Sequence, residues 1–251
     1  SEEEIIADLD VPGVIRTAGW IESGGLVGLV LEDIGGASLD ALRRARPFSV
    51  LEVIELGIAL AETLAHVHQR GVIHKDINPS NVIYDPSKHA LRLIDFGIAS
   101  RVSRQRVDAR PPNRLEGTLR YIAPEQTGRV NRCVDQRSDL YSLGATLYFL
   151  ATGKPVFELA DARELVHAHI ARRPSPPSSL NAEVPAMLDA VILRLLEKNA
   201  EDRYQSAIGV KRDLERVKQA VARGEPDARF ELAVDDLVDR RVLPHQARFR
   251  Q

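Results

Sequence analysis

Residues 71–86 read GVIHKDINPSNVIYDP, and this stretch sets four polar side chains between two apolar runs: His74, Asp76, Asn78 and Asn81. Polar groups beside a buried element are costly unless they make hydrogen bonds or take part in chemistry. Taken alone, the stretch is most simply a turn, because Asp and Asn favour turns and helix caps. The surrounding sequence has to decide between a turn and a chemical site.

Composition narrows the classes of protein that are possible. The 251 residues are enough for one large domain or two small ones, and 44% apolar residues allow a sizeable core. The net charge of −2 gives no reason to expect nucleic acid or an anionic membrane as a partner. The single cysteine, Cys133, allows no internal disulfide. With neither a membrane-span pattern nor a signal-peptide pattern, we expect a cytoplasmic protein.

The first hundred residues alternate short strand-like runs with turns. Strands are expected near 14–18 and 26–31, and the Gly24-Gly25 pair would make them a hairpin. Two further strands are expected at 82–84 and 91–94. This part of the chain therefore predicts small antiparallel sheets.

Helical periodicity dominates elsewhere. Ser38 is expected to cap a short helix that reaches about Arg46, and Ser49 with Glu52 has the capping-box pattern before a long helix that Gly71 ends. Further helices are expected at 138–152, 161–172, 185–197 and 206–222. Residues 99–116 lack apolar periodicity and are expected to form a long loop, and 224–251 are expected to be a linker.

Three oxygen-bearing side chains are expected to meet near the 82–94 hairpin. Asp76 and Asn81 precede its first strand, and Asp95 follows its second, so Asn81 and Asp95 should reach the same end. An amide oxygen with a carboxylate suits Mg²⁺, which takes phosphate oxygens and waters as its other ligands. Asp76 would then lie close enough to orient a hydroxyl group. The arrangement fits phosphoryl transfer, which needs alignment and charge neutralisation more than covalent help.

Three motifs follow in the order of a protein kinase: HKDINPSN (74–81), DFG (95–97) and APE (123–125). Each motif is weak alone, but together and in order they are specific. The sequence resembles a eukaryotic-type serine/threonine protein kinase domain, carried by HKDINPSN, LIDFGIAS, EGTLRYIAPEQTGRVNR and DLYSLGATLYFLATGKPVF. In particular it resembles the kinase module at the front of large bacterial multidomain signalling proteins that continue into an ATPase-like region and a sensor histidine kinase.

The resemblance implies roles at the reacting end of the site, with ATP and Mg²⁺ as cofactors. Asp76 would orient the acceptor hydroxyl, Asn81 and Asp95 would hold Mg²⁺, and Thr118 would face the catalytic aspartate. Asn78 stands where the family usually has a lysine, and it can donate hydrogen bonds to a phosphate but brings no charge. Lys75 stands where an arginine is usual. These two replacements weigh against strong catalysis.

The resemblance also implies an adenine site and structural partners. Leu31 would be the gatekeeper, and the carbonyl of Glu32 and the amide of Ile34 would meet the adenine edge. Glu2 would be the helix-C glutamate. Three further residues would support the site: His74 would support the DFG turn, Glu125 would pair with Arg203, and Asp139 would brace the catalytic loop. Two alternatives stay open, namely that Glu125 and Arg203 form a surface pair of little worth and that Asp139 is merely a helix N-terminal carboxylate.

The implied fold is an α+β protein-kinase-like domain with a truncated N-lobe, made of helix C and a β-hairpin, and a mostly α-helical C-lobe. Residues 1–34 would be the N-lobe remnant and hinge, 35–223 the C-lobe and 224–251 a linker toward a following domain. These residues contain neither a Gly-rich loop nor the strand lysine, so weak activity is expected of them alone. Residues 98–122 would be the activation segment, with Ser100 and Ser103 as candidate phosphorylation sites among arginines.

The expected partners are ATP, a protein substrate with a Ser/Thr acceptor, and C-terminal domains of the same polypeptide. An alternative function belongs to another class: a pseudokinase-like regulatory or scaffolding module that controls those domains. The Asp76, Asn81 and Asp95 set favours the enzyme, whereas Asn78 favours the regulatory module. A nucleic-acid binder has only the short basic loop in its favour and the net charge against it.

Overall fold

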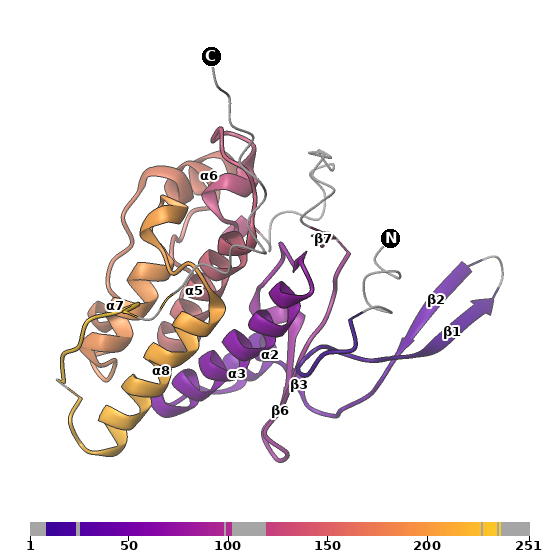
Figure 1. The fold of residues 1–251 in the computed structure, drawn as a ribbon, viewed down its shortest axis with the longest axis horizontal. Coiled ribbons are helices and arrows are strands. Elements are labelled where there is room, and N and C mark those ends of the chain that lie inside the picture. The colour runs from indigo at the N-terminus through magenta and orange to yellow at the C-terminus, as the bar shows by residue number, and fades with distance from the viewer. Residues whose placement is uncertain are drawn as a thin grey trace.

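The computed structural model describes residues 9–23, 26–97, 99–101, 119–226, 228–234 and 236. A β-hairpin stands out to one side, a small sheet lies in the middle, and helices gather on the opposite side (Figure 1). The chain is thus an α+β fold in which the described strands lie within residues 17–101, two helices interrupt them, and the remaining helices follow. No helix in the described ranges has the length and apolar character needed to cross a membrane.

The projecting hairpin consists of β1 (Thr17–Ser23) and β2 (Leu26–Leu31), which pair antiparallel. The prediction of a first strand at 14–18 was wrong. Gly13 turns the chain with φ +85°, and Val14 and Ile15 then pair with Leu93 in another sheet. A Cβ at Gly13 would collide with the Thr63 side chain, so a glycine is needed there.

The central sheet has the order β3-β5-β6, formed by β3 (Ala37–Ser38), β5 (Val82–Asp85) and β6 (Ala90–Leu93). The predicted strands at 82–84 and 91–94 are confirmed to within a residue. A separate pair is formed by β4 (Val72–Ile73) and β7 (Ser100–Arg101). Strands β4 and β5 thus lie on either side of the polar residues 74–81.

Two capped helices follow the hinge region. Ser38 Oγ accepts the amide of Ala41 at the start of α2 (Leu39–Ala45). Ser49 and Glu52 form both bonds of the capping box before α3 (Val50–Gln69), as predicted. The helix ends where Gly71, at φ +68°, turns the chain.

The remaining helices build the core of the helical part around α3. They are α5 (Gln136–Thr152), α6 (Ala162–Ala171), α7 (Ala186–Leu195) and α8 (Ala207–Ala222). Short 3-10 turns lie at Pro79–Asn81, Leu119–Tyr121, Pro124–Thr127, Pro177–Ser179 and Ala200–Asp202. Helix α3 packs against α5 and α8, and α5 also packs against α7. The helices predicted between residues 39 and 222 are all present, with ends that shift by one or two residues, whereas the predicted helix C lies outside the described residues.

Residues 228–234 and 236 fold back onto α8. The ring of Phe230 lies 3.8 Å below the guanidinium of Arg216, and the amide of Ala233 donates to Asp213 Oδ2 at 2.7 Å. Asp236 accepts hydrogen bonds from the amide of Gln205 and the hydroxyl of Ser206. This part of the expected linker therefore lies on the helical lobe; the division into remnant, lobe and linker stays a prediction.

Candidate active site

The carboxylate of Asp76 is held between two side-chain amides. Asn81 Nδ2 donates to Asp76 Oδ2 at 3.0 Å and to its backbone carbonyl at 2.9 Å. Asn78 Nδ2 donates to Asp76 Oδ1 at 2.9 Å and to the same carbonyl at 3.2 Å. We call these four hydrogen bonds the amide clamp. Three of the predicted site residues are thus brought together.

Asn78 also starts the 3-10 turn that carries Asn81. Its Oδ1 accepts from the amides of Ser80 at 2.9 Å and Asn81 at 3.2 Å, and Pro79 occupies the first position of the turn. Proline suits that position because its missing N–H would have had no partner there. The letters INPSN therefore describe a capped turn as well as a set of functional groups.

The β5–β6 hairpin brings Asn81 and Asp95 to one end. Val82 faces Leu93 in the register, and the carbonyl of Asn81 accepts from the amide of Ile94 at 2.9 Å. Asp95 has φ +63°, and its Oδ1 accepts from the amide of Gly97 at 3.1 Å. Burial raises the pKa of Asp76, and the nearby charge of Asp95 raises it further. Asp95 is thus close enough for its charge to act on Asp76.

The donor set fits a magnesium ion that shares a nucleotide. Asn81 uses its amide nitrogen in the clamp, so its amide oxygen is left to bind another partner at the end of the hairpin that also carries Asp95. Within the described residues, no group of three or more His, Cys, Asp or Glu side chains gathers at one point. A cation here would take oxygens from phosphates and water for its remaining ligands, which is how Mg²⁺ is usually held.

His74 is buried and neutral. Burial lowers its pKa, so the imidazole carries no charge at neutral pH. Its Nε2 donates to the carbonyl of Ile94 at 3.1 Å, and its Nδ1 accepts from the amide of Asp76 at 3.2 Å. The ring meets that of Phe96 edge-on at 4.5 Å. His74 therefore ties the catalytic loop to the DFG turn, as the resemblance implies.

Asp139 is fully buried in α5 and braces the loop. It accepts from the backbone amides of His74 at 2.9 Å and Lys75 at 2.7 Å, and it bonds His68 Nε2 at 2.9 Å. Burial would raise its pKa, but the hydrogen bond and charge of His68 and the hydrogen bond from the His74 backbone amide hold the pKa of Asp139 below the usual value. The cap of α5 is Asp135 instead. The bracing role is confirmed, and the alternative of a mere helix-terminal carboxylate falls.

Glu125 and Arg203 form a buried bidentate ion pair. The two Glu125 oxygens lie 2.6 and 2.9 Å from the guanidinium nitrogens, and Ser138 Oγ donates to Glu125 at 2.8 Å. Both residues are at most 5% exposed. The alternative of a surface pair is therefore wrong.

The expected adenine end lies where β2 runs into the hinge. Leu31 ends β2 and is 38% exposed. The Glu32 carboxylate accepts from the amide of Arg16 at 3.1 Å and from Arg92 Nε at 2.9 Å, while the Ile34 carbonyl accepts from Lys88 Nζ at 2.9 Å. Among the described residues, no hydrogen bond uses the Glu32 carbonyl or the Ile34 amide, the two groups expected to meet adenine.

Comparison with known proteins identifies the family. The protein kinase domain family matches residues 1–213. The chain belongs to this family. It is 35% identical over 232 residues to the serine/threonine-protein kinase PknB of Mycolicibacterium smegmatis, and 35% identical over 230 residues to PknB of Mycobacterium tuberculosis. Each match covers 90% of this chain and 36% of the relative.

A relative of lower sequence identity also carries the name of a serine/threonine-protein kinase. The chain is 30% identical over 219 residues to a probable serine/threonine-protein kinase, SCO3848, of Streptomyces coelicolor, covering 85% of the chain and 32% of that protein. The chain thus spans about a third of the length of these relatives. It is a eukaryotic-type serine/threonine protein kinase domain of the kind found in bacterial proteins.

Two supporting residues of this kinase domain escaped the sequence reasoning. Gln126 Nε2 donates to the carbonyl of Lys75 at 2.7 Å while its Oε1 accepts from the amide of Ala123, so it joins the APE turn to the catalytic loop. His68, the second partner of Asp139, lies on α3. The position of Gln126 directly after APE was the only available signal, and nothing near His68 marked it. The predictions for Glu2, Ser103 and Thr118 lie outside the described residues.

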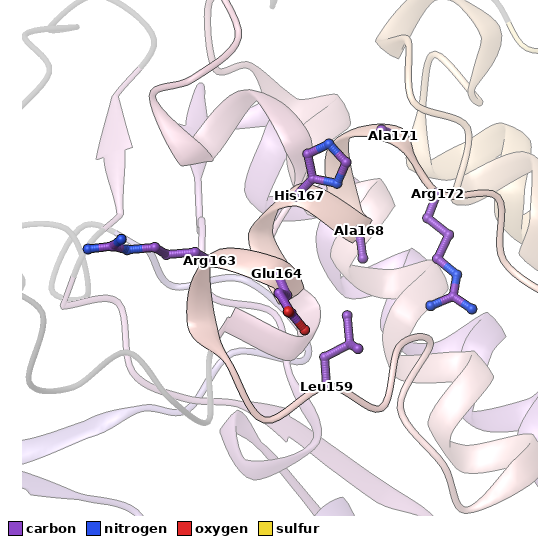
Figure 2. Close-up of a pocket in the computed structure, with 7 residues that line it drawn as sticks. All are labelled: Leu159, Arg163, Glu164, His167, Ala168, Ala171 and Arg172. Carbon is purple, nitrogen blue, oxygen red and sulfur yellow. The ribbon is translucent and has the colours of Figure 1, made fainter.

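A hollow of about 560 Å³ lies along α6 (Figure 2). In Figure 2 the Leu159 and Glu164 side chains approach one another in it, whereas Arg163 points away. None of its lining residues belongs to the amide clamp or to the expected adenine end. The hollow is therefore no part of the candidate active site.

Proposed function

We propose that this domain transfers the γ-phosphate of ATP to a serine or threonine hydroxyl of a protein. The amide clamp carries the proposal, because it fixes the Asp76 carboxylate directly before the hairpin that brings Asn81 and Asp95 to one end. In the transfer, the acceptor oxygen forms a bond to the γ-phosphorus, the bond to the β–γ bridging oxygen breaks, and ADP leaves. Asp76 aligns the hydroxyl and receives its proton.

The other site residues take the roles that the resemblance implies. Asn81 and Asp95 hold Mg²⁺, which neutralises charge on the phosphate oxygens. Leu31 lines the adenine site, with the Glu32 carbonyl and the Ile34 amide at the adenine edge. Thr118 faces Asp76. The position of Asn81 and Asp95 at one end of the hairpin supports the metal site.

Weak transfer is expected from residues 1–251 alone. They contain no G-x-G-x-x-G motif and no V-A-I-K-like strand, the parts that cover and pair the phosphates in this family. Losing one preorganised charge contact costs about 2.7–4 kcal/mol of transition-state stabilisation. Steady-state turnover at ordinary kinase rates by these residues would contradict this expectation.

The wider setting is part of the proposal. We expect a cytoplasmic role in signal transduction, with a protein substrate and with domains that follow in the same polypeptide. The alternative is a regulatory or scaffolding module that binds nucleotide weakly and controls those domains. One observation favours it: Asn78 supplies no positive charge beside the expected phosphates.

An Asp76→Ala variant of the full-length protein tests the enzyme against the alternative. Transfer to protein should be abolished, because no other group aligns the hydroxyl, while Mg·ATP binding and the far-UV circular dichroism should remain. A matched control is Asp161→Asn, which replaces the exposed cap of α6 with another good capping residue and should leave transfer unchanged. Unchanged transfer in Asp76→Ala removes the catalytic assignment. Mg·ATP binding without transfer by the wild type supports the regulatory module.

A further inference from the structure

We propose that Asn78 is a positioning residue that fixes the Asp76 carboxylate, and that it does not bind the phosphates of ATP. The proposal rests on the proposed transfer function and deepens it. It also departs from the expectation that Asn78 donates hydrogen bonds to a phosphate.

The hydrogen-bonding capacity of Asn78 is fully used inside the loop. An asparagine side chain offers two N–H donors and an oxygen with two lone pairs. Both donors go to Asp76, one to Oδ1 and one to the backbone carbonyl, and both lone pairs accept, from the amides of Ser80 and Asn81. The residue is 6% exposed. Nothing remains on the side chain to donate to a phosphate.

The orientation of the amide is fixed by its partners. The amides of Ser80 and Asn81 can only donate, so the side-chain oxygen of Asn78 must face them. Its nitrogen therefore faces Asp76. A flipped amide would set N–H against N–H on one side and oxygen against a carboxylate on the other.

Asn78 and Asn81 act on the two oxygens of one carboxylate. Asn78 holds Oδ1 and Asn81 holds Oδ2, so the plane of the carboxylate cannot rotate without breaking a bond. Asn78 also caps the turn from which Asn81 projects. Without Asn78, one oxygen loses its donor and the other clamp residue loses its support.

A lysine at this position would not perform the same task. Its ammonium group has three donors and no acceptor, so the amide of Ser80 would lose its partner and the amide of Asn81 would keep only the backbone carbonyl of residue 78. The sequence here therefore has a neutral residue that shapes the loop where a cation would act on the phosphates. The positive charge near the phosphates must come from elsewhere.

The variant Asn78→Ser separates the two duties of the residue. Serine is a good cap and keeps an acceptor for the turn, but it is too short to reach Asp76 Oδ1. We expect kcat of the full-length protein to fall by about tenfold or more, because a hydrogen bond to a charged group is lost. The KM for ATP should not change.

A matched control and a charge variant sharpen the test. Asn199 stands before another 3-10 turn and donates to Asp202 Oδ2 at 2.9 Å, so Asn199→Ser should leave kcat and the KM for ATP unchanged. Asn78→Lys should lower kcat as Asn78→Ser does. A higher KM for ATP with unchanged kcat in Asn78→Ser, or faster transfer in Asn78→Lys, would overturn the proposal.

A crystal structure of Asn78→Ser separates this inference from the proposed function. The Asp76 carboxylate should lose its fixed orientation in the variant even if the wild type transfers no phosphate, in which case the proposed function fails and the positioning role stands. An Asp76 carboxylate that keeps its wild-type orientation in a folded Asn78→Ser protein refutes the positioning role.

Discussion

Replacing Glu125 with glutamine isolates the energetic role of the buried ion pair. The side chain keeps its size, but the negative charge is lost and one oxygen becomes an NH₂ group that faces the guanidinium. Arg203 is 1% exposed and donates to the carbonyls of Glu197, Arg137 and Lys198 in addition to Glu125. It also stacks on the ring of Tyr141 at 4.9 Å. The charge would therefore stay buried with dipoles as its only partners.

The expected cost follows from that burial. Removing one partner of a buried pair destabilises a protein by about 3–5 kcal/mol, because the remaining charge is uncompensated. Domains of this kind are stable by about 5–15 kcal/mol, so the loss is a large share of the total. With a urea m-value of about 2 kcal/mol/M, the unfolding midpoint should fall by about 2 M.

Urea unfolding followed by far-UV circular dichroism measures this cost, because the signal comes from the helices that surround the pair. A matched control is Glu55→Gln, which breaks the exposed pair of Glu55 with Lys218 at 2.8 Å and should cost at most about 1 kcal/mol. In the double variant Glu125→Gln with Arg203→Met, the cost should fall below the sum of the two single costs. A cost for Glu125→Gln no larger than that of the control would refute the reasoning.

The same pair predicts a pH dependence. Burial alone would raise the pKa of Glu125, but the hydrogen bonds and charge of Arg203 hold it below the usual value. A lowered folded-state pKa gives stability that is present above the ordinary pKa of a glutamate and is lost as pH falls through the folded value. The difference in stability between wild type and Glu125→Gln should therefore shrink at acid pH.

Three further outcomes are expected. Asp139→Ala leaves two backbone amides of the catalytic loop unpaired in the core and should cost about 2–4 kcal/mol in thermal or urea unfolding, so a cost below about 1 kcal/mol would remove its bracing role. Gly209→Ala puts a methyl group into the side chain of Asp236, so hydrogen exchange at 228–234 should quicken while α8 keeps its protection; unchanged exchange would contradict the packing. Burial lowers the pKa of Lys198 to about 8, so between about pH 8 and about pH 10 the unfolded chain binds more protons than the folded one. Over this range the free energy of unfolding of wild type should rise by up to about 3 kcal/mol relative to Lys198→Met. Absence of this rise in urea unfolding would show that Lys198 is solvated.

Elements fixed by neighbouring residues were predictable. The capping box of Ser49 and Glu52 is a local exchange of two hydrogen bonds, so its four letters carry the whole signal. The antiparallel strands at 82–85 and 90–93 follow from a short turn between apolar runs, and their pairing puts Asn81 and Asp95 at one end. The shared position of Asn81 and Asp95 could therefore be predicted, because one hairpin places both residues.

Features that depend on residues distant in the sequence could not be predicted from local patterns. The bracing role of Asp139 was implied only by the family resemblance, because its partners lie 64 to 71 residues away and no local pattern distinguishes that role from a helix-terminal carboxylate. Val14 reads like the start of the first strand, yet it pairs with Leu93 in another sheet. That Asn78 uses all of its side-chain hydrogen-bonding capacity becomes evident only when its four partner atoms are placed. In each case the deciding contact is a tertiary one, and sequence spacing carries little information about it.

The packing of α8 on α3 sets a limit on where this lobe can be trimmed. The family match ends at residue 213, in the middle of α8, but Leu214, Val217 and Ala220 beyond it are buried. The Leu214 side chain approaches the bare backbone of Gly57 on α3 so closely that an added methyl group would touch it at 3.0 Å. A chain that ended at residue 213 would expose apolar residues of α3 to water. Its low solubility or stability would therefore say nothing about catalysis. The lobe therefore extends at least to the end of α8.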